Sequence, residues 1–255
     1  MQDKGKFIVF EGIDGSGKST QIRLLSEHLK KEGISCYTTM EPTDGPVGSL
    51  VHQIMIGRMK ADNKVIASLF AADRLDHLLN EVNGLVAKIE EGTTVISDRY
   101  YLSSYAYHSV DMPMEQVIAM NAPSRDLLKP ALHIFVDIDP DTAVARIAAN
   151  RQHTELFEKK SRLEKTREQY LNVMEKLQGE ENIVIIDGTQ SVEEIAEERS
   201  EVKVCKVNVD EQPELAVKFR VMSIPTLILV KGGVEADRAV GARPKEEILA
   251  FLGLK

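Results

Sequence analysis

The chain has 255 residues, of which 28% are charged and 43% hydrophobic, and a formal net charge of −8 at pH 7. This composition is that of a globular protein long enough to bury a sizeable core, and it excludes a disordered or fibrous chain. The negative charge argues against broad binding to nucleic acid, although a local basic cleft for a small anion is compatible with it. Apolar runs such as Thr226–Val230 have the length of a strand, well below the ~20 residues of a membrane span. Cys36 and Cys205 stand far apart, which favours a reducing compartment and hence the cytoplasm.

Short apolar runs alternate with helical patterns over residues 1–199, and this order predicts a parallel α/β sheet covered by helices. Because the runs are continuous and rich in β-branched residues, we expect strands that are buried on both faces. The predicted strands are Lys6–Phe10, Ile34–Thr39, Thr94–Ser97, Leu132–Asp137 and Ile183–Ile186. The predicted helices are Lys18–Lys31, Lys64–Glu91, Pro140–Asn150, Phe157–Leu177 and Val192–Glu198.

A second pattern of elements begins near Glu201, with no Gly/Ser/Pro-rich linker before it. We therefore predict a separate small α/β segment over residues 201–255. Pro213 is expected to open its first helix, and Lys231-Gly232-Gly233 to form the turn of a β-hairpin. Its predicted elements are a strand over Val202–Val209, a helix over Glu214–Phe219, hairpin strands Thr226–Val230 and Val234–Val240, and a helix from Pro244 to near Leu252.

The segment Gly12–Ser19, GIDGSGKS, matches the pattern G-x-x-x-x-G-K-[ST] between a predicted strand and a predicted helix. Glycines let backbone N–H groups curl around phosphate oxygens, and the helix N-terminus adds the positive end of its dipole. In such a loop Lys18 reaches the β- and γ-phosphates of ATP, and the Ser19 hydroxyl is a ligand for Mg²⁺. The predicted ATP-binding residues are Gly12, Ile13, Asp14, Gly15, Ser16, Gly17, Lys18, Ser19 and Thr20.

Asp98 and Arg99 directly follow the predicted strand Thr94–Ser97, at the carboxyl edge of the sheet where doubly wound folds bind ligands. A carboxylate at this edge can hold hydrated Mg²⁺, and Arg99 can bridge a phosphoryl acceptor and the transferred group. Taken alone, such a pair is more often a surface ion pair. The phosphate-binding loop in the same sheet favours the functional interpretation.

Phe70 and Arg74 lie four residues apart on a predicted helix and therefore share a face. A ring that can stack, beside a guanidinium that can bind a base edge, predicts a nucleobase pocket. The alternative is a core phenylalanine beside an exposed arginine.

The stretch Thr142–Tyr170 carries arginines at regular intervals together with acidic residues. This pattern is typical of a solvated, salt-bridged helical face. It also fits a lid that folds over ATP and excludes water. The arginines are Arg146, Arg151, Arg162 and Arg167, and the acids include Glu155 and Glu158.

Taken together, these residues resemble the thymidylate kinases of the nucleoside monophosphate kinase group, over about residues 5–199. The resemblance rests on the ordered segments FIVFEGIDGSGKSTQ, EPTDGPVG, LFAADR, DRYYLSSYAYH, IFVDIDP and RQHTELFE. It implies a P-loop kinase fold with a five-stranded sheet and a helical lid. It further implies Mg²⁺-dependent transfer of the ATP γ-phosphate to dTMP, which gives dTDP and ADP on the route to dTTP, and a homodimer.

The resemblance also assigns roles to individual residues. Asp14 would lie near the sugar and phosphate of the acceptor, and Arg99 would bind its phosphate. Some relatives carry an arginine inside the loop and others supply it from the lid; Gly15 and Arg151 fit the second arrangement, so Arg151 would neutralise charge in the transition state. The catalytic residues would be Lys18, Asp14, Arg99 and Arg151; the metal ligands Ser19 and Asp98; and the substrate-binding residues Phe70, Arg74, Arg99, Ser104, Tyr107 and Glu158.

Two positions depart from the pattern of the family. His108 stands where many relatives have Gln, and Thr43 follows Glu41-Pro42 without the arginine found there in some relatives. Two other functions stay open. Beside phosphorylation of dTMP, the alternatives are a kinase for another pyrimidine nucleoside monophosphate and a thioredoxin-like adaptor on a degenerate kinase scaffold.

Residues 201–255 resemble the second half of thioredoxin, in VKVCKVNVDEQPELAVKFRVMSIPTLILVKGG followed by VGARPKEEILAFL. The resemblance implies a cis peptide bond at Ile224-Pro225. The chain contains no C-x-x-C motif, which argues against dithiol redox chemistry. The first two strands of thioredoxin are missing, so we expect a fragment that does not complete the usual sheet by itself.

Overall fold

The computed structural model describes residues 4–150, 156–197, 213–221, 223–231, 234–241, 247–248 and 251. The chain forms two compact units, Met1–Glu198 and Arg199–Lys255. Among the helices of the described residues, none has the length and apolar character that a membrane span needs.

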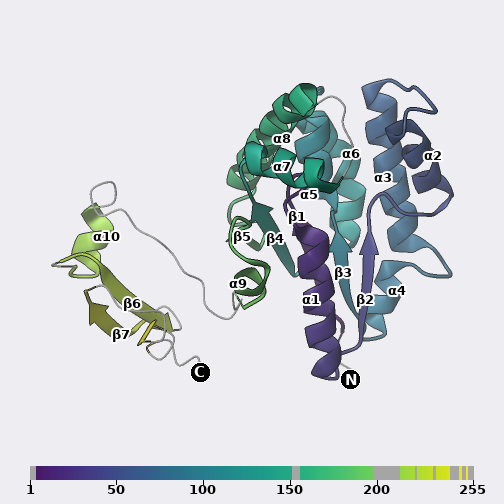
Figure 1. Cartoon of the computed structure of the whole chain (residues 1–255). Helices are drawn as coiled ribbons and strands as arrows, with labels where there is room; N and C mark the ends of the chain where they lie inside the picture. Colours follow the sequence, from purple (N-terminus) through teal and green to yellow (C-terminus); the bar gives the residue numbers. More distant parts are fainter. Residues whose placement is uncertain are drawn as a thin grey trace. The chain divides into compact units, whose positions relative to one another are not determined.

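The first unit is built on a five-stranded parallel sheet with the strand order β2-β3-β1-β4-β5 (Figure 1). The strands are β1 (Phe7–Glu11), β2 (Cys36–Met40), β3 (Thr94–Asp98), β4 (Leu132–Asp137) and β5 (Ile183–Asp187). This confirms the predicted parallel α/β fold. The prediction that every strand is buried on both faces is wrong for β2 and β5, because these strands form the edges of the sheet. Tyr37 and Ile185 are accordingly 37% and 55% exposed.

Nine helices occur in the described part of this unit: α1 (Lys18–Lys31), α2 (Pro46–Met55), α3 (Asn63–Leu79), α4 (Leu85–Glu90), α5 (Tyr101–His108), α6 (Met114–Leu127), α7 (Pro140–Asn150), α8 (Leu156–Lys176) and α9 (Val192–Glu197). The sequence did not predict α2, α5 and α6. For α5 the reason is burial: Tyr101–Ala106 are all buried, so the helix has no polar face and no amphipathic pattern.

The single helix predicted over Lys64–Glu91 is wrong, because the chain forms α3 and α4 with a break between them. Asn80 ends α3, and its carbonyl oxygen accepts a hydrogen bond from the N–H of Gly84 at 2.8 Å. A Cβ at Gly84 would lie 2.5 Å from that oxygen. The tight turn therefore requires glycine at this position, which the helical periodicity does not reveal.

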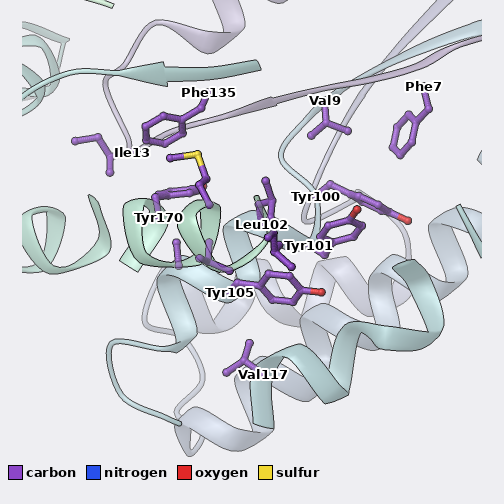
Figure 2. Packing of buried hydrophobic residues seen from close by; sticks show 14 of the residues in the cluster. Phe7, Val9, Ile13, Tyr100, Tyr101, Leu102, Tyr105, Val117, Phe135 and Tyr170 are labelled. Atoms are coloured by element: carbon purple, nitrogen blue, oxygen red, sulfur yellow. The ribbon is translucent and has the colours of Figure 1, made fainter. Parts of the chain in front are cut away.

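The two faces of the sheet carry two separate cores, because successive side chains of β1 point in opposite directions. Phe7 and Val9 lie in the larger core, which is completed by helices α3 to α8. Figure 2 shows this core, with the tyrosines of α5 beside β1 and α8. Phe10 lies in the smaller core with Ile22 of α1 and Ile195 of α9. The helix α9 is thus an integral part of the first unit.

The second unit contains α10 (Pro213–Lys218) and an antiparallel hairpin of β6 (Thr226–Lys231) and β7 (Val234–Val240). Both the helix and the hairpin were predicted. The Ile224-Pro225 peptide bond is cis, as the resemblance implies, and so is Glu41-Pro42 in the first unit. The predicted strand Val202–Val209 and most of the predicted last helix lie outside the described residues.

Candidate active site

The predicted phosphate-binding loop connects the end of β1 to the start of α1. Gly12 and Gly15 have φ angles of 142° and 83°, which side-chain-bearing residues rarely adopt. A Cβ at Gly12 would lie 2.6 Å from the Val136 carbonyl oxygen, and one at Gly15 would lie 2.8 Å from that of Ala143. The first turn of α1 contains no acidic side chain. The positive end of the helix dipole faces the loop, because the loop leads into the N-terminus of α1, and no carboxylate of the first turn offsets it.

Lys18 is buried and lies folded over this loop. Its Nζ atom donates hydrogen bonds to the carbonyl oxygens of Gly12 at 3.1 Å and Ile13 at 3.2 Å. Burial, helped by the nearby positive charge of Arg99, lowers the pKa of Lys18 to about 8. Because burial leaves the ammonium group with little solvation, an anion that enters the loop can interact with it strongly.

Ser19 and Asp98, the predicted metal ligands, lie together at the carboxyl ends of β1 and β3. The Ser19 hydroxyl donates to Asp98 Oδ2 at 2.9 Å. The other carboxylate oxygen, Asp98 Oδ1, is buried and has no hydrogen-bond partner among the described residues. A hard oxygen pair with one unsatisfied atom fits Mg²⁺, which takes few protein ligands when a nucleotide phosphate supplies the others. The described residues contain no group of three or more His, Cys, Asp or Glu that could hold a metal ion alone.

Arg99 connects the loop to helix α5. Its guanidinium donates to the Gly12 carbonyl oxygen at 3.0 Å, to Asp14 Oδ1 at 2.5 Å and to the Tyr107 hydroxyl at 3.0 Å. The guanidinium also lies over the ring of Tyr107, 4.8 Å from its centroid. Burial alone would raise the pKa of Asp14, but the charges of Arg99 and Lys18 outweigh burial and hold it below its ordinary value. Asp14, Arg99 and Tyr107, each predicted for this site, therefore meet in it.

The backbone of Arg99 is in the left-handed region, with φ of 76°, although the residue is not glycine. Its N–H donates to the Phe10 carbonyl oxygen at 2.9 Å, and its own carbonyl oxygen accepts from the Ser97 hydroxyl at 2.8 Å. Strained non-glycine residues persist only where the surroundings hold them in place, and they cluster at functional sites.

The predicted base pocket combines α3 with α5. Phe70 is half-buried and meets the His108 ring edge-on, with the centroids 5.1 Å apart. Arg74 is not the exposed arginine of the alternative interpretation, because it is only 1% exposed. Its guanidinium donates to the Ser104 hydroxyl at 3.1 Å, so two residues predicted for the pocket are in contact. Burial lowers the pKa of His108 to about 4, so that its ring is neutral near pH 7.

Glu41 and Asn121 hold Arg74, and neither of them is among the predicted site residues. Glu41 Oε2 accepts a hydrogen bond from Arg74 Nε at 2.7 Å and forms an ion pair with Arg74 Nη2 at 2.7 Å. Asn121 accepts a hydrogen bond from the same guanidinium. The neighbouring Asp73 accepts bonds from the backbone N–H and the hydroxyl of Thr43, at 2.7 and 2.6 Å. Glu41 belongs to the quoted segment EPTDGPVG, which is a usable signal, whereas no local pattern marks Asn121.

Glu11 forms a second unpredicted cluster beneath Arg99. Its buried carboxylate accepts from the Ser103 hydroxyl at 2.5 Å, the Tyr170 hydroxyl at 3.0 Å and the Tyr100 backbone N–H at 3.1 Å. Burial raises the pKa of Glu11, against the lowering effect of nearby positive groups. Glu11 and Ser103 stand inside two of the segments that carry the family resemblance, FIVFEGIDGSGKSTQ and DRYYLSSYAYH, whereas no local pattern marks Tyr170.

Only part of the predicted lid lies within the described residues. Arg151 lies outside the described residues, as does Glu155, and the Glu158 side chain is likewise not described on α8. Two of the other arginines form ion pairs within the unit: Arg162 with Asp111 at 3.0 Å, and Arg167 with Asp137 at 2.7 Å. These pairs support the salt-bridged interpretation for those two positions.

Comparison with known proteins agrees with this geometry. The family model described as Thymidylate kinase matches residues 10–198, and the model described as Thioredoxin matches residues 189–253. The chain is 38% identical to a probable thymidylate kinase of Methanocaldococcus jannaschii over 193 residues, covering 75% of this chain and 92% of that protein. It is 34% identical to a thymidylate kinase of Ligilactobacillus salivarius over 203 residues, covering 76% and 95%. We conclude that the chain belongs to the thymidylate kinase family and is thus a nucleoside monophosphate kinase.

Proposed function

We propose that the chain phosphorylates dTMP to dTDP, with ATP as the phosphoryl donor and Mg²⁺ as the metal. The observation that carries the proposal is the position of Arg99. One guanidinium contacts the phosphate-binding loop at Gly12 and Asp14 and also reaches Tyr107 on the acceptor side. A cation between two binding regions can hold the acceptor phosphate in line with the γ-phosphate of ATP.

On the donor side, the loop and Lys18 would bind the β- and γ-phosphates of ATP. Ligand phosphates would replace the carbonyl oxygens that Lys18 now contacts, and the buried ammonium would gain a stronger partner. Ser19 and Asp98 would hold Mg²⁺, which neutralises phosphate charge when bound. Arg151 is our proposed source of additional positive charge on the transferred group, since Gly15 leaves the loop without an arginine.

On the acceptor side, Phe70 would stack on thymine and Arg74 would donate to its edge, with Ser104 beside it. Because Glu41 and Asn121 fix the Arg74 guanidinium, its orientation is set before a ligand arrives, which reduces the entropy cost of recognition. Asp14 and Tyr107 would line the sugar, where Tyr107 crowds the 2′ position and disfavours ribose. Glu158 would touch the sugar from the lid side.

The experiment is a kinetic comparison of the purified chain with ATP, Mg²⁺ and each of dTMP, dUMP, UMP and CMP. We expect the highest kcat/KM for dTMP. A clearly higher kcat/KM for any of the others would overturn the assignment of the acceptor. In the same assay, the Asp98→Asn variant should need more Mg²⁺ to reach its half-maximal rate. Asp126 is an exposed carboxylate on α6, and the Asp126→Asn variant should behave as the wild type.

We further propose that the chain is a cytoplasmic homodimer whose product enters dTTP synthesis. Support for a dimer comes from large apolar side chains exposed on α2 and just beyond it: Leu50, Met55, Ile56 and Met59 are 44 to 64% exposed. Burial of such a patch against a second copy would be favourable. Light scattering of the purified chain should give twice the mass of 28.4 kDa, and a mass of one chain would overturn this proposal.

A further inference from the structure

We propose that Tyr170 is a positioning residue for the reaction, acting through Arg99. The inference rests on the proposed function, because it gives Arg99 the task of holding the acceptor phosphate. Tyr170 lies on α8, while Arg99 follows β3, so the contact joins two distant parts of the chain. The two residues are 71 positions apart.

The first support is the geometry of the Tyr170 hydroxyl. It lies 2.6 Å from the Ser103 hydroxyl, donates to Glu11 at 3.0 Å and accepts from the Arg99 guanidinium at 3.3 Å. Ser103 also accepts from Arg99, at 3.0 Å. Two hydroxyls thus lie between a buried carboxylate and a guanidinium that is only 16% exposed, and each of them contacts both charges.

The second support is the immobility of Tyr170 itself. Its ring is fully buried and packs on Phe135 of β4, with the centroids 5.0 Å apart, as Figure 2 illustrates. Burial raises the pKa of Tyr170 well above its ordinary value, so the phenol keeps its proton. A rigid, protonated phenol can fix the direction of the guanidinium nitrogen with which it is bonded.

The third support is that the two terminal guanidinium nitrogens of Arg99 have different partners. One nitrogen, Nη1, faces Gly12, Ser103 and Tyr170, while the other, Nη2, faces Asp14 and Tyr107. The inner nitrogen is therefore occupied by fixed partners of the fold. The outer nitrogen is the one whose partners line the proposed acceptor site. Removal of one inner partner should let the guanidinium rotate and should misplace the outer nitrogen.

The test compares kinetic constants of the full chain and its Tyr170→Phe variant with dTMP and ATP. Tyr170→Phe should lower kcat/KM for dTMP about tenfold, mainly through kcat, and leave KM for ATP within twofold. The matched control is Tyr105→Phe on α5, because the buried Tyr105 hydroxyl has no hydrogen-bond partner among the described residues. This control should keep kcat/KM within twofold of the wild type.

A double-mutant cycle separates positioning from a general loss of structure. In an Arg99→Lys background, Tyr170→Phe should change kcat/KM by less than twofold, since its partner is already gone. An equal loss in both backgrounds, or unchanged kinetics in Tyr170→Phe, would overturn the inference. If Tyr170→Phe does not fold, Ser103→Ala takes its place in the same cycle with the same criteria.

The wild type and Arg99→Lys in this assay also keep the inference separate from the proposed function. A wild type that does not phosphorylate dTMP, or an Arg99→Lys variant with wild-type kinetics, would overturn the proposed function and the inference with it. An active wild type, a strongly impaired Arg99→Lys and an unaffected Tyr170→Phe would overturn the inference alone.

Discussion

The two units of the chain differ in how they use apolar side chains. The kinase unit buries two cores against both faces of its sheet, with residues such as Val9, Val95 and Val136 fully inaccessible. In the described part of the second unit Ala239 alone is a buried apolar residue, and Val217, Val234 and Ile224 are 77%, 69% and 70% exposed. A two-stranded hairpin is marginal by itself in water. We infer that the free energy of folding and the catalytic function both reside in the kinase unit.

The largest effect is expected from Lys18→Ala, which removes the cation folded over the phosphate-binding loop. Loss of one preorganised charge that stabilises a transition state costs about 10³-fold in kcat. We therefore expect kcat for dTMP phosphorylation to fall by about 10³-fold in a coupled assay of ADP release. Lys31→Ala, an exposed lysine at the other end of α1, is the control and should retain full activity. Full activity in Lys18→Ala would mean that the kinase unit does not carry the function in the way proposed.

Glu41→Gln should strongly destabilise the kinase unit, because it leaves the buried Arg74 charge without its carboxylate partner. The two side chains are 2% and 1% exposed, and removing one partner of such a pair costs about 3 kcal/mol in the free energy of unfolding. Urea denaturation measures this loss. The matched control is Glu27→Gln, whose pair with Arg23 lies on the surface and should contribute less than about 0.5 kcal/mol. Equal effects of the two changes would contradict the structural role of the Glu41–Arg74 pair.

Acid should weaken the kinase unit through His108, and all six histidines of the chain precede residue 199. The folded-state pKa of His108 is about 4, below its ordinary 6.5. The unfolded chain therefore binds a proton that the folded chain rejects, so stability is complete above pH 6.5 and is lost as the pH falls towards 4. Between pH 7.5 and pH 5 the free energy of unfolding should drop by about 2 kcal/mol from this residue.

The check is urea denaturation of the wild type and His108→Gln at both pH values. Glutamine does not titrate, so the variant should lose about 2 kcal/mol less than the wild type between the two conditions. The substitution leaves Tyr107 and Arg74 unchanged, so the comparison isolates the side chain at position 108. An identical pH dependence in both proteins would show that His108 is not buried as a neutral ring.

The smallest effect is expected from truncation after Glu198, which removes the second unit and leaves both cores of the first intact. kcat/KM for dTMP should stay within twofold of the full chain. A larger loss would show that the second unit contributes to catalysis, and so would break the contrast. A second truncation, after Gly188, tests whether α9 contributes to the stability of the kinase unit. It also removes Ile195, a buried residue of the smaller core, and should lower the free energy of unfolding by at least about 3 kcal/mol.

This pair of truncations also bears on the domain boundary. The Thioredoxin family model begins at residue 189, inside the stretch that the Thymidylate kinase model covers. The packing of α9 on α1 and the hydrogen bond from the Gln21 side chain to the Val192 carbonyl oxygen assign Val192–Glu197 to the first unit. We therefore propose residues 1–199 as the kinase domain, with the thioredoxin-like segment after it.

The sequence by itself predicted the elements that depend on local chemistry. The glycines of Gly12–Ser19 are required by left-handed backbone and close carbonyl groups, and so they are visible in one short segment. The strands of the hairpin and the run of strands and helices are local in the same sense. The sequence also placed Asp98 and Arg99 correctly, because the residues after a parallel strand always lie at one edge of the sheet.

Only the tertiary structure decided which strands form the edges, which helices are buried all round, and which residues support the site. Glu11 and Tyr170 are 159 positions apart and meet because β1 and α8 pack against the same core. A single glutamate and a single tyrosine so far apart form no sequence pattern that predicts their contact. Their contact arises from the packing of the whole unit. A buried carboxylate is stable only where the fold places hydrogen-bond donors against it.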